Sequence, residues 1–456
     1  MMERLSDVAG RLNAPLHGTD GAFTSVNTDT RKLQRGDLFV ALKGENFDAH
    51  EFVRRAGSLG AVGAVVSTRI ECELPQIVVS DTLVALQNYA ASWRSDFKLP
   101  VVAVTGSNGK TTTKQMLSAI LAARGPVLAT EGNLNNHIGV PLTLLRLRAE
   151  HRTAVIEMGA NHPGEIAALT AIAKPDAGVI TQAGDAHLEG FGTREGVARA
   201  KGELFAGLRS DGLAAINRDD SYYPLWRELA GTRNVISFGL HEQADVRALN
   251  VMDEPADAPT AICFELRAPG GRASVSLPLP GRHNVSNALA AATVAVGLGM
   301  DLEIIAQGLA QVQGASGRVS WKTTHEGARV IDDTYNANPT SMGAALDLLA
   351  GLSGERIAVL GDMGELGADA ARLHFDVGKK ARSVGIDRLL LLGKLAREMA
   401  AGFGEGARHF DSIEELTAAV RPLLKPGVSV LVKGSRSSRM ERVVAALMNE
   451  EVMETH

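Results

Sequence analysis

The stretch Val101–Thr113 reads VVAVTGSNGKTTT, and it decides how the rest of the chain is interpreted. Its β-branched start is typical of a buried strand, and Gly106 and Gly109 then permit a tight turn. Residues 110–123 have helical composition and spacing. A strand, a glycine turn and a helix N-terminus bring several backbone N–H groups to one point, which suits a phosphate group, with Lys110 as the cation and the Thr111 hydroxyl beside a magnesium ion. The alternative is a purely structural turn, because Val104 stands where the usual P-loop spacing has glycine.

Length and composition narrow the class of protein. With 456 residues the chain is long enough for about three domains, and 45% hydrophobic with 22% charged residues is typical of a globular enzyme. A net charge of −5 argues against a broad nucleic-acid surface. Cys72 and Cys263 are too isolated for a disulfide framework or a zinc site. The N-terminus lacks the apolar core of a signal peptide, and the apolar run 288–298 is too short to span a bilayer. We expect a cytoplasmic protein without a membrane span.

Apolar runs divide the chain into three α/β domains. We predict a small α/β N-terminal substrate domain over residues 1–81, with strands at 36–42, 61–67 and 75–80 and a helix at 50–59. A central P-loop ATPase domain, residues 82–313, begins with a helix at 81–93. Its strands at 101–105, 153–158, 177–181 and 212–217 alternate with helices, which indicates a mostly parallel sheet. Alternating polar and apolar residues at 260–266 and 272–279 predict an antiparallel hairpin. After a linker at 314–317, strands at 328–332, 356–361, 388–393 and 428–432 predict a Rossmann-like domain, residues 314–456.

Polar residues at strand ends are candidates for chemistry, because strand ends converge on the ligand crevice of a parallel sheet. Glu157 ends an apolar strand, and a carboxylate there can hold magnesium beside a P-loop. His187 is either a second metal ligand or a partner of a backbone carbonyl. Lys201 lies on a probable helix, where the pattern alone predicts a solvated lysine.

Three further polar stretches can contact a ligand. Asn284 and Asn287 offer donors and acceptors to a base such as adenine, although helix capping is the commoner role of asparagine. The segment 332–339, DDTYNANP, closes a strand with adjacent acids, which favours binding. The turns 28–31 and 43–50 carry side chains that suit phosphate or sugar hydroxyls, unless they are ordinary solvated loops.

Taken together, these motifs resemble the Mur ligases of peptidoglycan synthesis, over nearly the whole chain. The P-loop alone is similar to those of Mur ligases and folylpolyglutamate synthetases. The branch that adds D-alanyl-D-alanine is indicated by NLNNHIGVPLTLL, DDTYNANPTSM and KGSRSSRME. The remaining motifs in order are TDTRKLQRGDLFVALKGENFDAHEF, TGSNGKTTTK, IEMGANHPGEI, AHLEGFGT, KGELF, GRHNVSNALAA and VLGDMGELG.

The resemblance implies an ATP-dependent peptide ligase that joins D-alanyl-D-alanine to UDP-N-acetylmuramoyl-tripeptide through an acyl phosphate, with ATP and magnesium, as a monomer. It implies catalytic roles for Lys110, Glu157, His187, Lys201 and Arg318. ATP would contact Gly106, Ser107, Asn108, Gly109, Lys110, Thr111, Thr112, Asn284, Asn287 and Asp333. Magnesium would be held by Thr111, Glu157, His187 and a carbamylated Lys201. The substrates would contact Thr28, Arg31, Lys43, Asp48, His50, Asn135, Asn136, Asn336, Asn338 and Arg436.

Three other functions stay open at this point. A regulatory P-loop switch would bind nucleotide and move a partner, without turning over a third substrate. A ligase of the same kind that accepts diaminopimelate, lysine or a folate-type substrate would differ in the amine or acid that it uses. A UDP-sugar-binding scaffold without activity would have no use for the P-loop.

Overall fold

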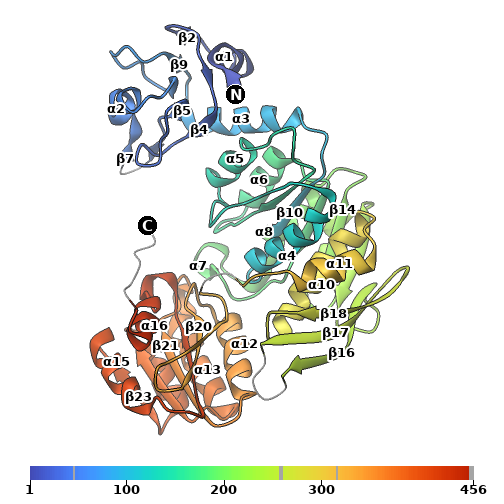
Figure 1. Cartoon of the computed structure of the whole chain (residues 1–456), viewed down its shortest axis with the longest axis vertical. Coiled ribbons are helices and arrows are strands. Elements are labelled where there is room, and N and C mark those ends of the chain that lie inside the picture. The colour runs from blue at the N-terminus through green and yellow to red at the C-terminus, as the bar shows by residue number, and fades with distance from the viewer. Residues whose placement is uncertain (45–46, 256–259, 315–316, 451–456) are drawn as a thin grey trace.

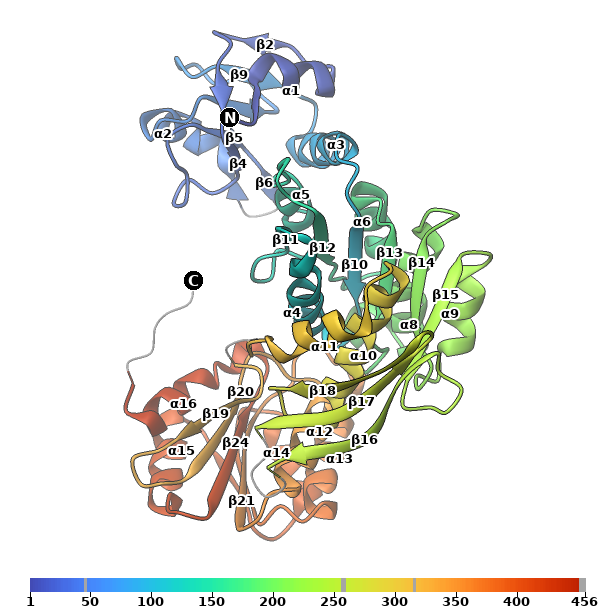
Figure 2. The same ribbon diagram turned by 45° about the vertical axis from the view of Figure 1, so that its right-hand side comes forward.

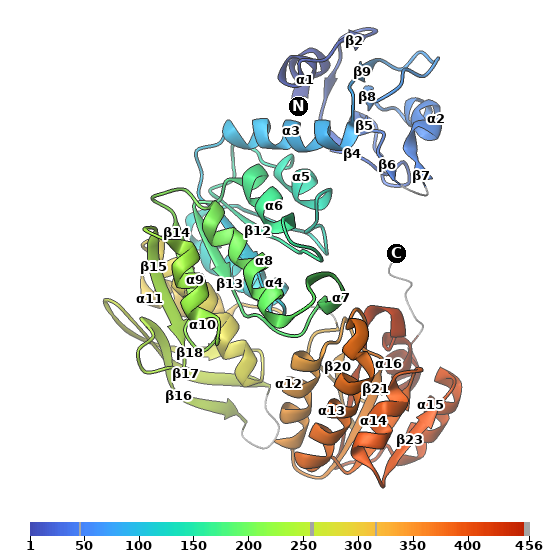
Figure 3. The same ribbon diagram turned by 180° about the vertical axis from the view of Figure 1, so that it is seen from behind.

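Three large β-sheets of five, nine and six strands follow one another along the chain, and they lie in three bodies (Figure 1). The computed structural model describes residues 1–44, 47–255, 260–314 and 317–450. The N-terminal and C-terminal bodies lie at opposite ends of the central one in each view (Figures 2 and 3). The predicted α/β class is therefore confirmed. The boundaries 81/82 and 313/314 stay predictions, and residues 315 and 316 of the predicted linker lie outside the described residues.

The N-terminal body contains a five-stranded sheet in the order β2-β9-β8-β5-β4, parallel except for the β2–β9 pair. The predicted strands correspond to β5, β8 and β9, and the predicted helix to a 3₁₀ turn, Ala49–Phe52, followed by α2. The other strands have two or three residues, too few for a periodic pattern. The elements are β1 (Glu3–Arg4), α1 (Leu5–Leu12), β2 (Leu16–His17), β3 (Ala22–Phe23), β4 (Ser25–Asn27), β5 (Asp37–Val40), β6 (Lys43–Gly44), β7 (Phe47–Asp48), α2 (Val53–Ser58), β8 (Gly63–Val66) and β9 (Gln76–Val78).

Helix α3 (Thr82–Ser95) joins the N-terminal and central bodies. The Asp81 side chain caps it by accepting hydrogen bonds from Leu83 N and Val84 N at 2.8 and 3.0 Å. Toward the N-terminal body, the buried Tyr89 hydroxyl donates to Glu3 Oε2 at 2.9 Å. Toward the central body, Trp93 Nε1 donates to the Leu147 carbonyl at 3.3 Å. One continuous apolar core therefore runs through α3.

The central sheet has nine strands in the order β11-β12-β10-β13-β14-β15-β16-β17-β18, parallel as far as β16 and antiparallel beyond it. The predicted hairpin is β17–β18, and β11, β15 and β16 were not predicted. The elements are β10 (Val101–Thr105), α4 (Lys110–Leu121), β11 (Val127–Ala129), α5 (Gly139–Leu144), β12 (Thr153–Glu157), α6 (Glu165–Ala173), β13 (Ala177–Ile180), α7 (Leu188–Phe191), α8 (Arg194–Gly207), β14 (Leu213–Asn217), α9 (Tyr223–Ala230), β15 (Asn234–Gly239), β16 (Val246–Glu254), β17 (Ala261–Ala268), β18 (Gly271–Leu277), α10 (Arg282–Gly297) and α11 (Leu302–Ala310).

Both faces of the central sheet are covered, which explains its uninterrupted apolar strands. In β10, Val101 and Ala103 pack with α3, α5, α6, α8 and α9 on one face. Val102 and Val104 pack with α4, α10 and α11 on the other. The P-loop follows β10 at the strand ends, between these two helical layers.

The C-terminal sheet has the order β19-β20-β24-β21-β22-β23 and is parallel except for β19. The four predicted strands are β20, β21, β22 and β24, so the Rossmann-like prediction is confirmed; β19 and β23 were not predicted. Helices α12, α13 and α14 cover one face, and α15 and α16 the other. The elements are β19 (Ser320–Thr323), β20 (Arg329–Asp333), α12 (Pro339–Ala350), β21 (Glu355–Gly361), α13 (Ala370–Ser383), β22 (Arg388–Leu392), α14 (Ala396–Phe403), β23 (Ala407–Phe410), α15 (Ile413–Val420), β24 (Val428–Lys433) and α16 (Glu441–Met448).

In the described part of the chain, no helix is both long and apolar enough to cross a bilayer.

Because one exposed carboxylate caps α3, the Asp81→Ala variant tests how this helix is anchored. We expect the free energy of unfolding to fall by about 1 kcal/mol, the usual cost of losing an N-cap side chain. Asp81→Asn keeps an acceptor oxygen and is expected to stay close to the wild type. Urea unfolding followed by circular dichroism measures both variants, and equal losses in the two would contradict the capping role.

Candidate active site

The P-loop backbone depends on two glycines. Gly106 has φ +146°, and a Cβ there would lie 1.9 Å from Thr181 Oγ1. Gly109 has φ +81°, and a Cβ there would lie 2.1 Å from Asn287 Oδ1. Only glycine adopts both the conformation and the close approach without strain. The loop between β10 and α4 is therefore held against β13 on one side and α10 on the other.

Lys110 and Thr111 begin α4 and face the cavity. The Lys110 ammonium donates to the Gly106 carbonyl at 2.7 Å, which folds its side chain back across the loop. Burial lowers the pKa of Lys110, Glu157 opposes that shift, and Arg318 adds to it. Two cations thus face the point where the loop's N–H groups converge, as an anion-binding site requires.

Glu157 ends β12 and is almost fully buried. Its Oε1 accepts from Asn135 Nδ2 at 2.9 Å, and its backbone N–H donates to Thr130 Oγ1 at 2.9 Å. Among the described residues no donor hydrogen-bonds its Oε2, which lies 3.3 Å from Lys114 Nζ. A buried carboxylate oxygen without a hydrogen bond has unused capacity for a cation, so the residues present fit a magnesium ion.

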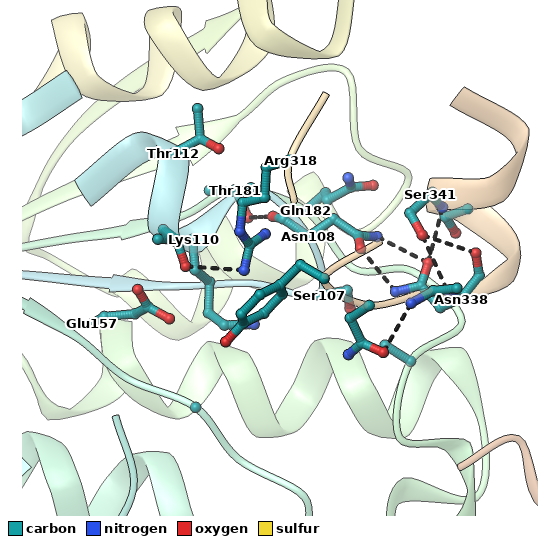
Figure 4. Close-up of a pocket in the computed structure, with 18 of the residues that line it drawn as sticks. Ser107, Asn108, Lys110, Thr112, Glu157, Thr181, Gln182, Arg318, Asn338 and Ser341 are labelled. Carbon is teal, nitrogen blue, oxygen red and sulfur yellow. Dashed lines mark hydrogen bonds between the residues drawn. The ribbon is translucent and has the colours of Figure 1, made fainter. Parts of the chain in front are cut away.

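A cavity of about 1270 Å³ opens at the P-loop and is lined by both the central and C-terminal bodies (Figure 4). It collects most of the predicted residues: Ser107, Asn108, Gly109, Lys110, Thr111, Thr112, Asn135, Asn136, Glu157, His187, Asn284, Asn287, Arg318, Asp333, Asn336, Asn338 and Arg436. Gly106, which belongs to the same loop, does not line the cavity. The volume is large enough for a nucleotide together with a second ligand.

Arg318 reaches the P-loop from the far side of the linker. Its Nη2 donates to Thr111 Oγ1 at 3.2 Å, and its guanidinium lies 4.2 Å from the centre of the Tyr335 ring. Tyr335 is tied to the same segment, because its N–H donates to the Gly317 carbonyl at 3.0 Å. The C-terminal body therefore places a cation, supported by an aromatic ring, against the P-loop (Figure 4).

Asp333 ends β20, and its carboxylate accepts from Lys433 Nζ at 2.6 Å. Lys433 is buried and also donates to the Asn336 carbonyl at 2.8 Å. Asp333, a predicted ATP contact, is thus held by a lysine on the neighbouring strand β24.

His187 pairs with a residue that the sequence did not suggest. Its Nδ1 contacts Oε2 of Glu365 in the C-terminal body, which lowers the pKa of Glu365. The Glu189 N–H also donates to the Glu365 carbonyl at 3.3 Å. In the described part of the chain, no three His, Cys, Asp or Glu side chains are grouped to hold a metal. The predicted metal role of His187 stays a prediction.

Lys201 does not line the cavity, and only 1% of it is exposed. It lies on α8 with its ammonium 5.6 Å from the centre of the Phe191 ring. Burial, with a smaller contribution from Lys110, lowers the pKa of Lys201 to about 7. The solvated lysine that the helical pattern predicted is therefore wrong, because tertiary packing covers this face of α8.

Asn284 and Asn287 make hydrogen bonds within α10 and to the residues just before it. Asn284 Nδ2 donates to the Pro280 carbonyl at 2.8 Å, and Asn287 Nδ2 donates to Asn284 Oδ1 at 3.1 Å. Asn287 Oδ1 faces Gly109, as described above. The adenine contact predicted for both residues stays a prediction.

The predicted substrate residues of the N-terminal body, Thr28, Arg31, Lys43, Asp48 and His50, lie outside the cavity. His50 is buried, with Nδ1 2.5 Å from Asp48 Oδ1 and Nε2 accepting from the Ser67 N–H at 2.8 Å. Arg31 is exposed and paired with Asp29 at 2.8 Å. Residues 45 and 46 of the predicted 43–50 loop lie outside the described residues. These substrate roles stay predictions.

Sequence reasoning missed Lys114, Tyr335, Glu365 and Lys433. Each stands inside a motif that the sequence analysis quoted, and Lys114 lies one helical turn after Lys110. What was missing was the partner of each residue, and sequence periodicity does not give a contact between different elements.

Comparison with known proteins identifies the family. Residues 104–295 match the Mur ligase middle domain, and residues 317–436 match the Mur ligase, glutamate ligase domain. The UDP-N-acetylmuramoyl-tripeptide--D-alanyl-D-alanine ligase of Escherichia coli is 44% identical, covering 97% of this chain and 98% of that protein.

Solved structures agree over the same length. MurF from Acinetobacter baumannii has a TM-score of 0.91 and 38% identity, with 98% of each chain covered. MurF ligase from Thermotoga maritima, solved in complex with ADP, has a TM-score of 0.83 and 30% identity, covering 93% of this chain and 97% of that one. On this evidence the chain belongs to the Mur ligase family and, within it, to the MurF ligases.

Proposed function

We propose that this protein uses ATP to join D-alanyl-D-alanine to UDP-N-acetylmuramoyl-tripeptide, making one amide bond for a peptidoglycan precursor. The observation that carries the proposal is the convergence of the P-loop, Glu157 and Arg318 in one two-domain cavity. Relatives that match over their full length bear the name of this activity. The further proposals are a cytoplasmic location, the monomeric state and the site residues that the resemblance implied.

A carboxylate is a poor acyl donor, because its leaving group would be an oxide. In the proposed reaction a carboxylate oxygen of the tripeptide attacks the terminal phosphorus of ATP. The bond to ADP breaks, and an acyl phosphate forms. The amine of the dipeptide then attacks the acyl carbon and loses a proton, and inorganic phosphate leaves. Because ATP supplies the chemical energy, the protein's tasks are positioning and charge neutralisation.

The chain's own groups fit these tasks. The backbone N–H groups at the start of α4 and the Lys110 ammonium hold the phosphates. Arg318 approaches from the opposite side, so a transferring phosphoryl group would lie between two cations. Glu157 and Thr111 are the residues that would hold magnesium, which supplies further positive charge at the phosphates when bound. The C-terminal body also limits the access of water, which would hydrolyse an acyl phosphate.

Lys110→Ala tests the phosphate site. Removal of one preorganised cation is expected to lower kcat about 10²-fold or more, while the fold is retained. Phosphate release in the presence of all three substrates measures the loss. Lys379→Ala, which removes an exposed lysine from α13, is the matched control and is expected to keep full activity. Near-normal turnover by purified Lys110→Ala would refute the phosphate-binding role.

The amine substrate decides between the remaining ligase activities. We expect ADP release with UDP-N-acetylmuramoyl-tripeptide to require D-alanyl-D-alanine, and diaminopimelate or lysine to give none. Mass spectrometry of the product checks that the dipeptide has been added. Turnover of UDP-N-acetylmuramoyl-dipeptide with a single amino acid would identify a different ligase, and ATP hydrolysis that is indifferent to any amine would favour the regulatory switch.

Lys201 is expected to carry a carbamate. Only a neutral amine reacts with carbon dioxide, and at an ordinary pKa near 10.4 roughly one lysine in a thousand or fewer is neutral at pH 7. At a pKa of about 7, roughly half of Lys201 is neutral at that pH. Burial therefore removes most of the free-energy cost of deprotonating the amine. Carbamylation is expected to increase as the pH rises through 7.

The measurement is ¹³C NMR with ¹³C-bicarbonate, which should show a carbamate signal in the wild type and none in Lys201→Ala. Lys201→Ala is also expected to lose activity, partly restored by short carboxylic acids that supply the missing oxygens. A wild-type spectrum without the signal, or full activity of the variant, would contradict the modification.

A further inference from the structure

Asn108 and Asn338 form a reciprocal amide pair across the boundary between the central and C-terminal bodies. Asn338 Nδ2 donates to Asn108 Oδ1 at 2.8 Å, and Asn108 Nδ2 donates to Asn338 Oδ1 at 3.2 Å. Figure 4 shows the two side chains facing each other with both bonds drawn. A ring of two hydrogen bonds requires the two amide planes to meet in one orientation, so the pair forms only in this arrangement of the bodies.

Both residues are fixed on their own side of the boundary. The Asn108 carbonyl accepts from Thr181 Oγ1 at 2.5 Å, which holds the P-loop peptide against β13. Asn338 caps α12, because its Oδ1 accepts from the Ser341 N–H at 2.9 Å while its own N–H donates to Ser341 Oγ at 3.0 Å. Each amide is thus presented by a rigid element, and little freedom is lost when they pair.

A second contact shows how closely the bodies approach here. A Cβ at Gly184 would lie 2.8 Å from Oγ1 of Thr340, in the first turn of α12. The Gly184 N–H in turn donates to Ser107 Oγ at 2.9 Å, beside Asn108 in the P-loop. The start of α12 therefore packs against the P-loop and its support.

The pair lies on the segment that also supports Arg318. Asn338 follows Tyr335 by three residues, and the Tyr335 ring lies under the Arg318 guanidinium. The C-terminal body therefore meets the P-loop at two points, Asn338 on Asn108 and Arg318 on Thr111, and these contacts flank Lys110. The short segment 335–338 carries Asn338 and also supports Arg318 through the Tyr335 ring.

We propose that Asn338 is a positioning residue: its amide pair with Asn108 fixes the C-terminal body on the P-loop so that Arg318 is aligned with the transferring phosphoryl group. This role takes the place of the substrate contact that the sequence resemblance implied for Asn338. The proposal rests on the proposed ligase function for its kinetic consequence, but the domain contact itself does not depend on the substrate.

The test is a double-mutant cycle of Asn108→Ala and Asn338→Ser. Serine is as good an N-cap as asparagine, so α12 keeps its cap, but it is too short to reach Asn108. Each single variant removes the same pair of bonds. We expect each to lower kcat for ATP-dependent ligation about 10-fold, and the double variant to be no slower than either single one. The KM values for ATP and for the dipeptide are expected to change less than threefold.

Ser412→Ala is the matched control, because it removes a cap from α15 in the same body, where the Ser412 hydroxyl accepts from the Glu415 N–H at 3.1 Å. It is expected to lower thermal stability without changing kcat. Independent losses that multiply to about 100-fold in the double variant would overturn the proposal. So would a raised KM for the dipeptide at unchanged kcat, which would make Asn338 a substrate ligand.

A distance measurement separates this proposal from the ligase function. Spin labels at Leu240→Cys in the central body and Phe375→Cys in the C-terminal body, both exposed positions, report the domain arrangement once Cys72 and Cys263 are replaced by serine. Asn108→Ala and Asn338→Ser are each expected to broaden the distance distribution of the free protein equally, and the double variant no further. Unchanged distributions in both single variants would overturn the proposal even if the ligase function is correct. If no amine supports turnover, the distance distributions still test whether the amide pair fixes the C-terminal body on the P-loop.

Discussion

The structure depends on the need to neutralise several negative charges at one place. Neither the central nor the C-terminal body alone supplies all the cations. A nucleotide, a carboxylate and a UDP-linked substrate are all anions, and they repel each other unless cations lie between them. The central body supplies Lys110 and the N–H groups at the start of α4. The second cation, Arg318, belongs to the C-terminal body and reaches Thr111 across the linker. The site is therefore complete only when the two bodies are in contact.

This constraint explains why polar residues gather where the bodies meet. Glu157, Lys114 and Thr130 form a buried polar group on the central side, and Asp333 with Lys433 forms one on the C-terminal side. Buried charges are costly unless they are paired or bind a ligand. Glu157 Oε2 sits beside Lys114 without a hydrogen bond from any described residue. This is the arrangement expected of a carboxylate that takes up a cation with its substrate.

His187 and Glu365 form a further side-chain contact at the cavity. The histidine belongs to the central body and the carboxylate to the loop between β21 and α13, so the pair is another bridge between the two bodies. This contact engages Nδ1, so a metal bound by His187 would have to take the other ring nitrogen, Nε2.

The sequence alone was sufficient for the P-loop, the three α/β units and the family, because these depend on local patterns. The apolar residues of Val101–Thr105 are enough by themselves to indicate a buried strand. A motif such as DDTYNANP can likewise be recognised because its residues are contiguous. Strands of two or three residues, the half-exposed strand β16 and the edge strand β19 were not predicted, because short or half-exposed segments have weak periodicity. The tertiary structure decided which side chains from distant segments come into contact. It buried Lys201 beneath packing that a helical pattern does not reveal, and it paired Asp333 with Lys433 from another strand. It also brought Asn338 onto Asn108, 230 positions earlier in the chain. Contacts between distant segments follow from how the sheets and domains pack, and the spacing of residues along the chain does not encode them directly.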